Sequence, residues 1–169
     1  MNKVCRLLAT ALVSVFALAP CLSTAGEDPV TVVENLQAAL VEAMKGGDSM
    51  DYDARYALLA PVALETHDFP FIAQIAMGRH WRQLTNEEQQ QYVNAFEEMS
   101  IASYASRFER YSGERFVVVE TYDNPRGGRV VICELRREGE QPLLFEYHLR
   151  QTGGDWRIVN IVVDGVSDL

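Results

Sequence analysis

The residues best suited to chemistry in this sequence are three histidines and a few carboxylates. His67, His80 and His148 are the only imidazoles, and no two of them lie at a spacing typical of metal ligands. The sequence contains no glycine-rich phosphate loop, no Gly-x-Ser-x-Gly turn and no His-Glu-x-x-His motif. The residue types therefore predict no catalytic residues, no metal site and no cofactor.

Residues 78–82 form the densest cluster of polar and aromatic side chains in the chain. One hypothesis makes His80 a general base beside arginines that bind an anion. We favour the alternative, in which this segment connects two helices, Trp81 fills the core and the arginines pair with acidic residues, because no nucleophile lies nearby in sequence. Asp68 and His80 remain the candidate acid and base if the protein is an enzyme.

The N-terminus has the three-part layout of a secretory signal peptide. Lys3 and Arg6 precede an apolar run from Leu7 to Ala19, and small residues follow at 23–25. We expect cleavage after Ala25, which leaves residues 26–169 as one domain. A membrane anchor or a buried core helix is the alternative, although the apolar run falls short of the roughly 20 residues that span a bilayer. Lipidation at Cys21 is a second alternative.

The charge and cysteine content narrow the possible partners. The chain of 169 residues has a formal net charge of −9, and cleavage removes two bases and no acids, which makes it −11. So acidic a protein is a poor ligand for nucleic acid or anionic lipid headgroups. Cys133 alone would remain in the mature chain, so no internal disulfide can form. Its place at the end of an apolar run predicts a buried side chain.

The first half of the mature chain has the periodicity of helices. Asp28 predicts an N-cap, and Thr85 followed by Glu88 forms a capping-box pattern at the start of the longest helix. Pro61 predicts a stop or kink, so we expect one helix over 52–60 and a short one around residue 63. A further helix is expected over 69–77. Two apolar stripes on the longest helix predict that a broad face of it is buried.

From residue 115 the periodicity shifts toward two, which indicates strands. Short turn sequences rich in glycine connect them, so we expect an antiparallel meander and an α+β domain. The last strand is apolar almost throughout and is predicted to be central in the sheet. The four expected strands are Phe116–Tyr122, Val130–Arg137, Leu143–Arg150 and Trp156–Asp164.

Several segments together resemble the MlaC family, also known as the toluene-tolerance auxiliary component family. Residues 66–69 and 77–85 are similar to the central motif of this family, and Tyr104 with Ala105 matches its aromatic element. Residues 156–160 and 163–167 are similar to its C-terminal signature. The sequence departs from the family in two ways: Asn160 stands where an acidic residue is expected, and members usually run on past this point into a further helical segment.

The resemblance implies helices packed on a curved four-stranded antiparallel sheet, with an apolar cavity between them. It implies a periplasmic, non-enzymatic carrier that binds phospholipid, or a related lipid, by its acyl chains. The implied partners are an inner-membrane ABC transporter with an MCE-domain subunit and an outer-membrane lipoprotein complex. Such a shuttle serves the lipid asymmetry of the outer membrane.

We expect nine side chains to contact the lipid, on the strength of apolar periodicity and the implied cavity. Gly78 and Gly165 are expected to serve backbone geometry. The expected lipid-binding residues are Ile72, Ile75, Trp81, Tyr104, Phe108, Phe145, Tyr147, Ile161 and Val163.

Two other functions fit the same pattern. A small isomerase or dehydratase can use a pocket on a similar α+β fold, with Asp68 and His80 as its acid and base. An interaction module would use its apolar faces entirely as core and would contain neither a cavity nor a bound ligand.

Overall fold

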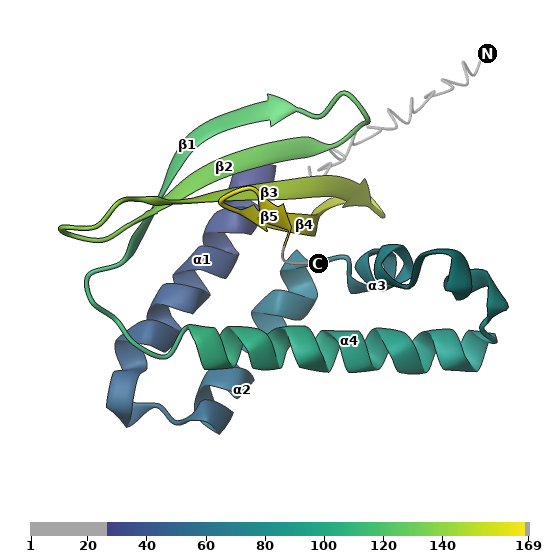
Figure 1. Cartoon of the computed structure of the whole chain (residues 1–169), viewed down its shortest axis with the longest axis horizontal. Coiled ribbons are helices and arrows are strands. Elements are labelled where there is room, and N and C mark those ends of the chain that lie inside the picture. Colours follow the sequence, from purple (N-terminus) through teal and green to yellow (C-terminus); the bar gives the residue numbers. More distant parts are fainter. Residues whose placement is uncertain (1–26, 168–169) are drawn as a thin grey trace, which may run out of the picture.

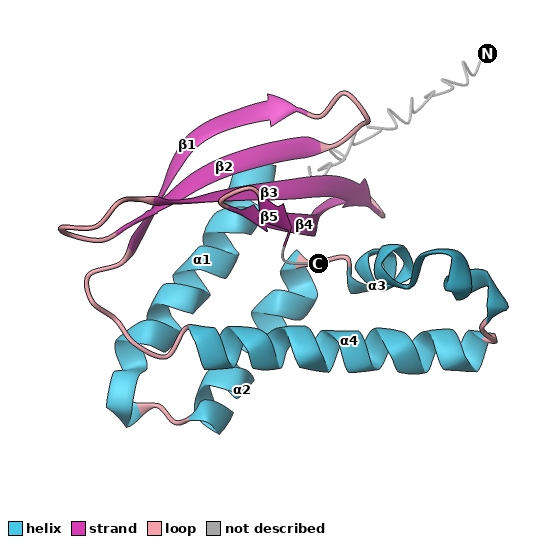
Figure 2. Ribbon diagram, in the orientation of Figure 1, coloured by secondary structure: helices cyan, strands magenta, loops and turns pink. Residues whose placement is uncertain are grey.

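Four long helices precede an antiparallel sheet in the computed structural model, which describes residues 27–167 (Figures 1 and 2). The predicted α+β class is confirmed, whereas the predicted signal peptide lies outside the described residues. The helices are α1 (Pro29–Gly46), α2 (Tyr52–Thr66), α3 (Phe69–Met77) and α4 (Asn86–Arg107), with the 3₁₀ helices η1 (Gly47–Ser49) and η2 (Gly78–Gln83). The strands are β1 (Arg115–Asp123), β2 (Arg129–Arg136), β3 (Leu143–Thr152), β4 (Asp155–Val163) and β5 (Val166–Ser167).

Side-chain caps begin the helices where the sequence predicts. Asp28 accepts a hydrogen bond from the Val30 amide at 2.9 Å. At α4 the Thr85 hydroxyl accepts from the Glu88 amide while the Glu88 carboxylate accepts from the Thr85 amide, so the capping box is confirmed. The Thr85 hydrogen bonds also lower the pKa of Glu88. No helix within residues 27–167 combines the length and the apolar run needed to cross a membrane.

The helix stop predicted at Pro61 is wrong, because α2 runs through it from Tyr52 to Thr66. A proline inside a helix removes one backbone hydrogen bond and disfavours the helix locally. Packing outweighs that preference here, since Leu59 and Ala63 on either side of the proline are fully buried. Arg55 adds a further tie, because its Nε donates to the Ala105 carbonyl of α4 at 2.8 Å.

The strands pair in chain order from β1 to β5, so the predicted meander is confirmed. The last long strand is covered, as predicted, but it is not central, because β4 is fourth in the order of five strands. On its outer side, within residues 27–167, β4 pairs with the short β5 and, at Ile158, with His67 in a single parallel bridge. Its apolar residues are covered by packing from α1, α2 and α3 rather than by neighbouring strands.

Two irregularities in the pairing bend the sheet. Val119 in β1 and Val159 in β4 have no partner in the register of their neighbours. Such bulges bend a strand and increase its twist. Beside the second bulge the Ile158 carbonyl accepts the Asp68 amide at 2.9 Å, which fixes the loop between α2 and α3 to the sheet.

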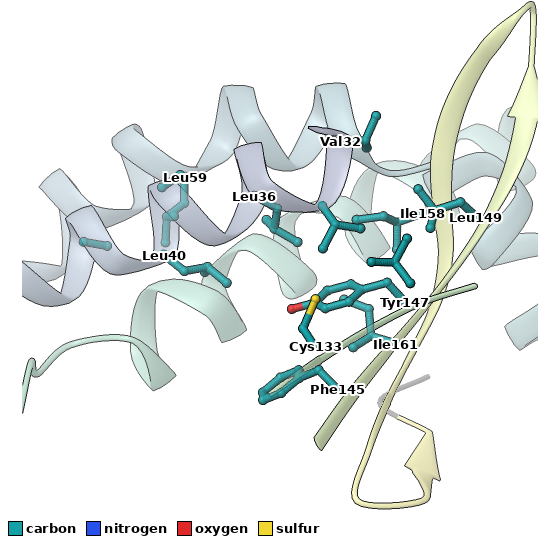
Figure 3. Packing of buried hydrophobic residues seen from close by; sticks show 14 of the residues in the cluster. Val32, Leu36, Leu40, Leu59, Cys133, Phe145, Tyr147, Leu149, Ile158 and Ile161 are labelled. Atoms are coloured by element: carbon teal, nitrogen blue, oxygen red, sulfur yellow. The ribbon is translucent and has the colours of Figure 1, made fainter. Parts of the chain in front are cut away.

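The main core lies between α1, α2 and one face of the sheet. Leu36 and Leu40 of α1 point toward Tyr147 of β3 (Figure 3). Cys133 lies beside Tyr147 and has no exposed surface, as predicted. A smaller cluster joins α2, α3 and α4 through Ala63, Phe69, Ile72 and Ile101.

The broad buried face predicted for α4 is wrong. Only Val93, Ile101 and Ala105 of this helix are buried. The helix packs mainly against α2 and α3, while α1, α2 and α3 make the close contacts with the sheet. Figure 1 shows α4 running alongside α2 and α3.

Candidate functional site

Two cavities lie where α4 stands away from the sheet. The first, here called the α3 cavity, lies between α3, α4 and β4 and has a volume of about 280 Å³. The second, called the α1 cavity, lies between α1, α4 and strands β2 to β4 and measures about 290 Å³. Each is at the lower end of the range for small-molecule pockets.

The α3 cavity has an apolar wall with polar groups along α4. Its apolar lining comes from all three elements that surround it: Phe69, Ile72, Phe96, Met99, Ile158 and Ile161. Its polar and amphipathic lining residues are His67, Ser100, Ser103, Tyr104, Arg107 and Asn160. Ser100 needs no partner across the cavity, because its hydroxyl donates to the Phe96 carbonyl of its own helix at 2.8 Å.

The α1 cavity is more uniformly apolar. Among the described residues that line it, Arg107 alone carries a formal charge. Tyr147 is almost fully buried, and burial raises the pKa of its phenol well above the ordinary value. The lining residues are Leu36, Leu40, Tyr104, Arg107, Phe108, Leu135, Leu143, Phe145, Tyr147, Ile161 and Val163.

The two cavities adjoin each other. Tyr104, Arg107 and Ile161 line both of them. Tyr104 and Arg107 come from successive turns of α4, and Ile161 comes from β4. The wall between the cavities is therefore built from one helix and one strand that face each other.

A buried histidine holds the tyrosine of this wall. The Nε2 atom of His67 lies 2.9 Å from the Tyr104 hydroxyl, and its Nδ1 lies 3.1 Å from the Ala63 carbonyl. The Thr66 hydroxyl, 3.0 Å from Nδ1, donates its own proton to the Val62 carbonyl at 2.7 Å. Because a carbonyl can only accept, Nδ1 carries the proton, and Nε2 accepts the hydrogen bond from the tyrosine. Burial lowers the pKa of His67 to about 4, so the ring is neutral at neutral pH.

Aromatic rings surround this hydrogen bond on both sides. The His67 ring stacks on Phe69 with centroids 5.0 Å apart and planes within 8° of parallel. Tyr104 also packs against Phe108 at 6.3 Å, in a tilted arrangement. Sequence reasoning missed the role of His67, although the residue lies in the segment 66–69 that carries the family resemblance. A buried position could not be inferred, because it depends on the bridge between His67 and β4.

Seven of the nine expected lipid-binding residues line these cavities. Ile72 lines the α3 cavity, and Tyr104 and Ile161 line both cavities. The other four line the α1 cavity: Phe108, Phe145, Tyr147 and Val163. Ile75 and Trp81 line neither. Ile75 is 57% exposed, and Trp81 is half-buried, with its ring edge against Tyr92 of α4. Nearly every residue of α3 is apolar, so the sequence could not show which face of it is buried.

Comparison with known proteins agrees with the sequence resemblance. The family described as MlaC protein matches residues 34–169. The chain belongs to the MlaC family. It is 23% identical to the toluene tolerance protein Ttg2D of Pseudomonas putida over 95% of this chain and 77% of that protein.

The MlaC-family fold is also found in a solved relative. The chain matches a phospholipid-binding protein from Ralstonia solanacearum, solved in complex with a phospholipid, with a TM-score of 0.67 and 24% identity. The match covers 82% of this chain and 76% of that one. The likeness confirms the predicted architecture, to which the short β5 is an addition.

Asp68 and His80, the pair considered for catalysis, have separate surroundings in this MlaC-family chain. The Asp68 carboxylate accepts from the Phe71 amide at 3.1 Å and the Thr152 hydroxyl at 2.7 Å, and Arg150 lies 3.8 Å away. His80 is exposed on η2, where its ring contacts neighbouring polar side chains of the same segment. Asp68 thus caps α3 and ties it to β3. Within residues 27–167, no three His, Cys, Asp or Glu side chains are grouped so as to hold a metal ion.

Proposed function

We propose that this protein is a periplasmic carrier that binds a phospholipid by its acyl chains and catalyses no bond chemistry. The observation that carries the proposal is the pair of adjoining, mainly apolar cavities between α4 and the sheet. Each Å² of acyl surface removed from water contributes about 25 cal/mol of binding free energy. The Ralstonia solanacearum relative, which shares the fold, was solved with a phospholipid bound.

The cavity dimensions support binding by the chains rather than by the whole lipid. A cavity of about 150 Å³ holds a benzene molecule. Cavities of about 280 and 290 Å³ therefore have room for a stretch of one acyl chain each and are too small for an entire phospholipid. The headgroup stays outside, which agrees with the small number of charged residues in the walls.

We further propose that the carrier shuttles lipid between two membranes. Its partners would be an inner-membrane ABC transporter with an MCE-domain subunit and an outer-membrane lipoprotein complex. Membership of the MlaC family supports this role. The acidic net charge, −9 for the full chain and more negative after cleavage, also favours brief contacts with basic surfaces on partner proteins over lasting adsorption to anionic lipid. Transfer of labelled phospholipid from the loaded protein to the reconstituted transporter tests the role directly.

Native mass spectrometry tests the binding function. The mature protein, purified gently from a bacterial periplasm, should carry phospholipid that organic extraction identifies. Phe145→Glu should abolish the bound species, since Phe145 is 8% exposed and faces the α1 cavity. Tyr122→Glu is the matched control, because this strand aromatic is 39% exposed and lines neither cavity.

The same measurement separates the competing functions. A mass without bound lipid, together with no uptake from lipid vesicles, would contradict the carrier function. It would favour the interaction module, although an interaction module is expected to contain no cavity. The enzyme hypothesis is tested by Asp68→Asn and His80→Gln. If either variant lost cellular function while retaining lipid, catalysis would replace carriage as the explanation.

A further inference from the structure

The lipid site is divided by one tyrosine that is held in place by a buried histidine. We propose that Tyr104, positioned by His67, separates two compartments, and that each compartment takes one acyl chain of a two-chain lipid. This inference rests on the proposed function and adds to it the residue pair that sets how many chains are bound and how bulky they can be.

The position of Tyr104 supports the division of the site. It lines the α3 cavity and the α1 cavity, whereas the aromatic residues one or two turns away line only one cavity each. Phe96 belongs to the α3 cavity and Phe108 to the α1 cavity. Phe96, Tyr104 and Phe108 follow each other at multiples of four residues, so they lie along one face of α4. The tyrosine therefore stands between the two compartments along the helix.

A hydrogen bond fixes the Tyr104 side chain in that position. A phenylalanine at residue 104 could swing between rotamers and join the compartments. The tyrosine hydroxyl instead donates to His67 Nε2 at 2.9 Å. His67 is itself fixed, because its other nitrogen is bound at Ala63 and its ring is stacked on Phe69. Moving Tyr104 would leave a buried ring nitrogen without a partner, which disfavours the open arrangement.

The volumes of the two compartments also support the division. The two compartments are nearly equal, at about 280 and 290 Å³, and both contact Arg107 and Ile161 at their common wall. Two chains joined through one glycerol can enter side by side from a shared wall and then diverge. A single undivided cavity would not select for two straight chains, because branched or fused-ring chains would fill it equally well.

Stoichiometry with single-chain lipid tests the division. Native mass spectrometry of the delipidated protein is carried out with palmitoyl lysophosphatidylcholine and with dipalmitoyl phosphatidylcholine. The expected result is two molecules of the single-chain lipid, or one of the two-chain lipid, per protein. Tyr122→Ala, which removes a strand aromatic that is 39% exposed and lines neither cavity, is the matched control and should retain this stoichiometry.

Competition between straight and methyl-branched chains tests the residue itself. Tyr104→Ala joins the compartments and should raise the preference for diphytanoyl over dipalmitoyl phosphatidylcholine by about tenfold, because branch methyls no longer overpack the space. Tyr104→Leu gives the same readout with more retained packing if the alanine variant does not fold. Tyr122→Ala, outside both cavities, should leave the preference unchanged.

The positioning role of His67 has its own signature. Tyr104→Phe and His67→Leu each remove the hydrogen bond and should raise the branched-chain preference by a similar, smaller factor. The double variant should do no more than either change alone, because both remove the same interaction. His67→Gln retains an acceptor for the tyrosine hydroxyl and should behave as the wild type does.

The outcomes distinguish the inference from the function on which it rests. If the wild type binds one two-chain lipid but only one single-chain lipid, and Tyr104→Ala leaves chain preference unchanged, the division is wrong and the carrier function stands. If the wild type takes up neither lipid, the proposed function fails and the inference fails with it.

Discussion

Helices α1 and α4 face the same side of the sheet and meet it in different ways. Val33 and Leu36 of α1 have almost no exposed surface and belong to the buried cluster that α1 shares with the strands. Along α4 only three residues are buried, and two cavities separate the helix from β4 and its neighbours. One sheet face therefore supports both a close-packed core and a hollow.

The side chains of the two helices explain the difference. The buried face of α1 is mainly aliphatic, so packing it on the sheet removes apolar surface from water. The face of α4 carries Ser100, Ser103, Tyr104 and Arg107, whose polar groups disfavour dry contact with apolar strands. The Ser100 hydroxyl donates to the Phe96 carbonyl of its own helix, and Tyr104 donates to His67, which follows α2 and pairs with Ile158 of β4. Ser100 and Tyr104 therefore have partners although α4 does not pack closely on the strands.

Truncating one side chain in the core and one on α4 should lower the free energy of unfolding by different amounts. Leu59→Ala in the α1 and α2 core should destabilise the protein by about 2–5 kcal/mol, because it opens a cavity in close packing. Phe96→Ala should have a clearly smaller effect, since its ring already borders a cavity. Urea unfolding measures both. Equal losses would mean that the α4 side is packed as tightly as the core.

Titration of His67 should give the next largest change in the free energy of unfolding. Its pKa is about 4 in the folded protein and near 6.5 in the unfolded chain, so the unfolded chain binds more protons between these values. The stabilisation is complete above about pH 6.5 and is lost as the pH falls toward 4. Between pH 7.5 and 5 the loss should be about 2 kcal/mol.

The matched variant isolates that contribution. His67→Gln cannot titrate but can still accept from Tyr104. Urea unfolding at the two pH values should therefore show the loss in the wild type and not in the variant. The same pH dependence in both proteins would assign it to other groups and would argue against a buried neutral His67.

The tie between α3 and the sheet should contribute about 2 kcal/mol to folding. Asp68→Ala removes the N-cap of α3 and the acceptor for the Thr152 hydroxyl. Asp68→Asn retains an acceptor at the cap and should lose less. Thermal unfolding checks the ranking, and an alanine variant as stable as the wild type would show that α3 is held by its apolar residues alone.

The smallest effect is expected at the start of α4. Thr85→Ala removes half of the capping box and should destabilise the protein by about 1 kcal/mol. Thr85→Ser retains the hydroxyl and should be close to neutral. Hydrogen exchange in the first turn of α4 should rise in the alanine variant. Unchanged exchange would mean that packing, rather than the cap, fixes this end of the helix.

The parts of the fold that depend on local chemistry could be predicted from the sequence. Asp28, Thr85 and the glycine turns between strands act within a few residues, so helix starts and the order of the strands were correct. Gly78 and Gly165 do have the positive φ angles, 59° and 81°, that suit glycine.

The errors concern features that depend on distant contacts. Pro61 lies in a continuous helix whose neighbouring residues Leu59 and Ala63 are buried by other elements. The apolar residues of β4 are covered by helices, although this strand is fourth in the order of five. An amphipathic stripe on α4 looks the same in sequence whether it meets a packed core or a hollow. For the same reason the sequence could not show that Ile75 and Trp81 lie outside the two cavities, and lipid contact by any of the nine residues stays a prediction.

The central claim is that acyl chains occupy the space between α4 and the sheet. Photocrosslinking with a phospholipid that carries a diazirine in one acyl chain, followed by peptide mapping, tests it most directly. The account predicts adducts on α4 near Met99 and Tyr104 and on β4 near Ile161. Adducts confined to the open groove between α1 and β1, near Lys45 and Tyr111, would contradict it.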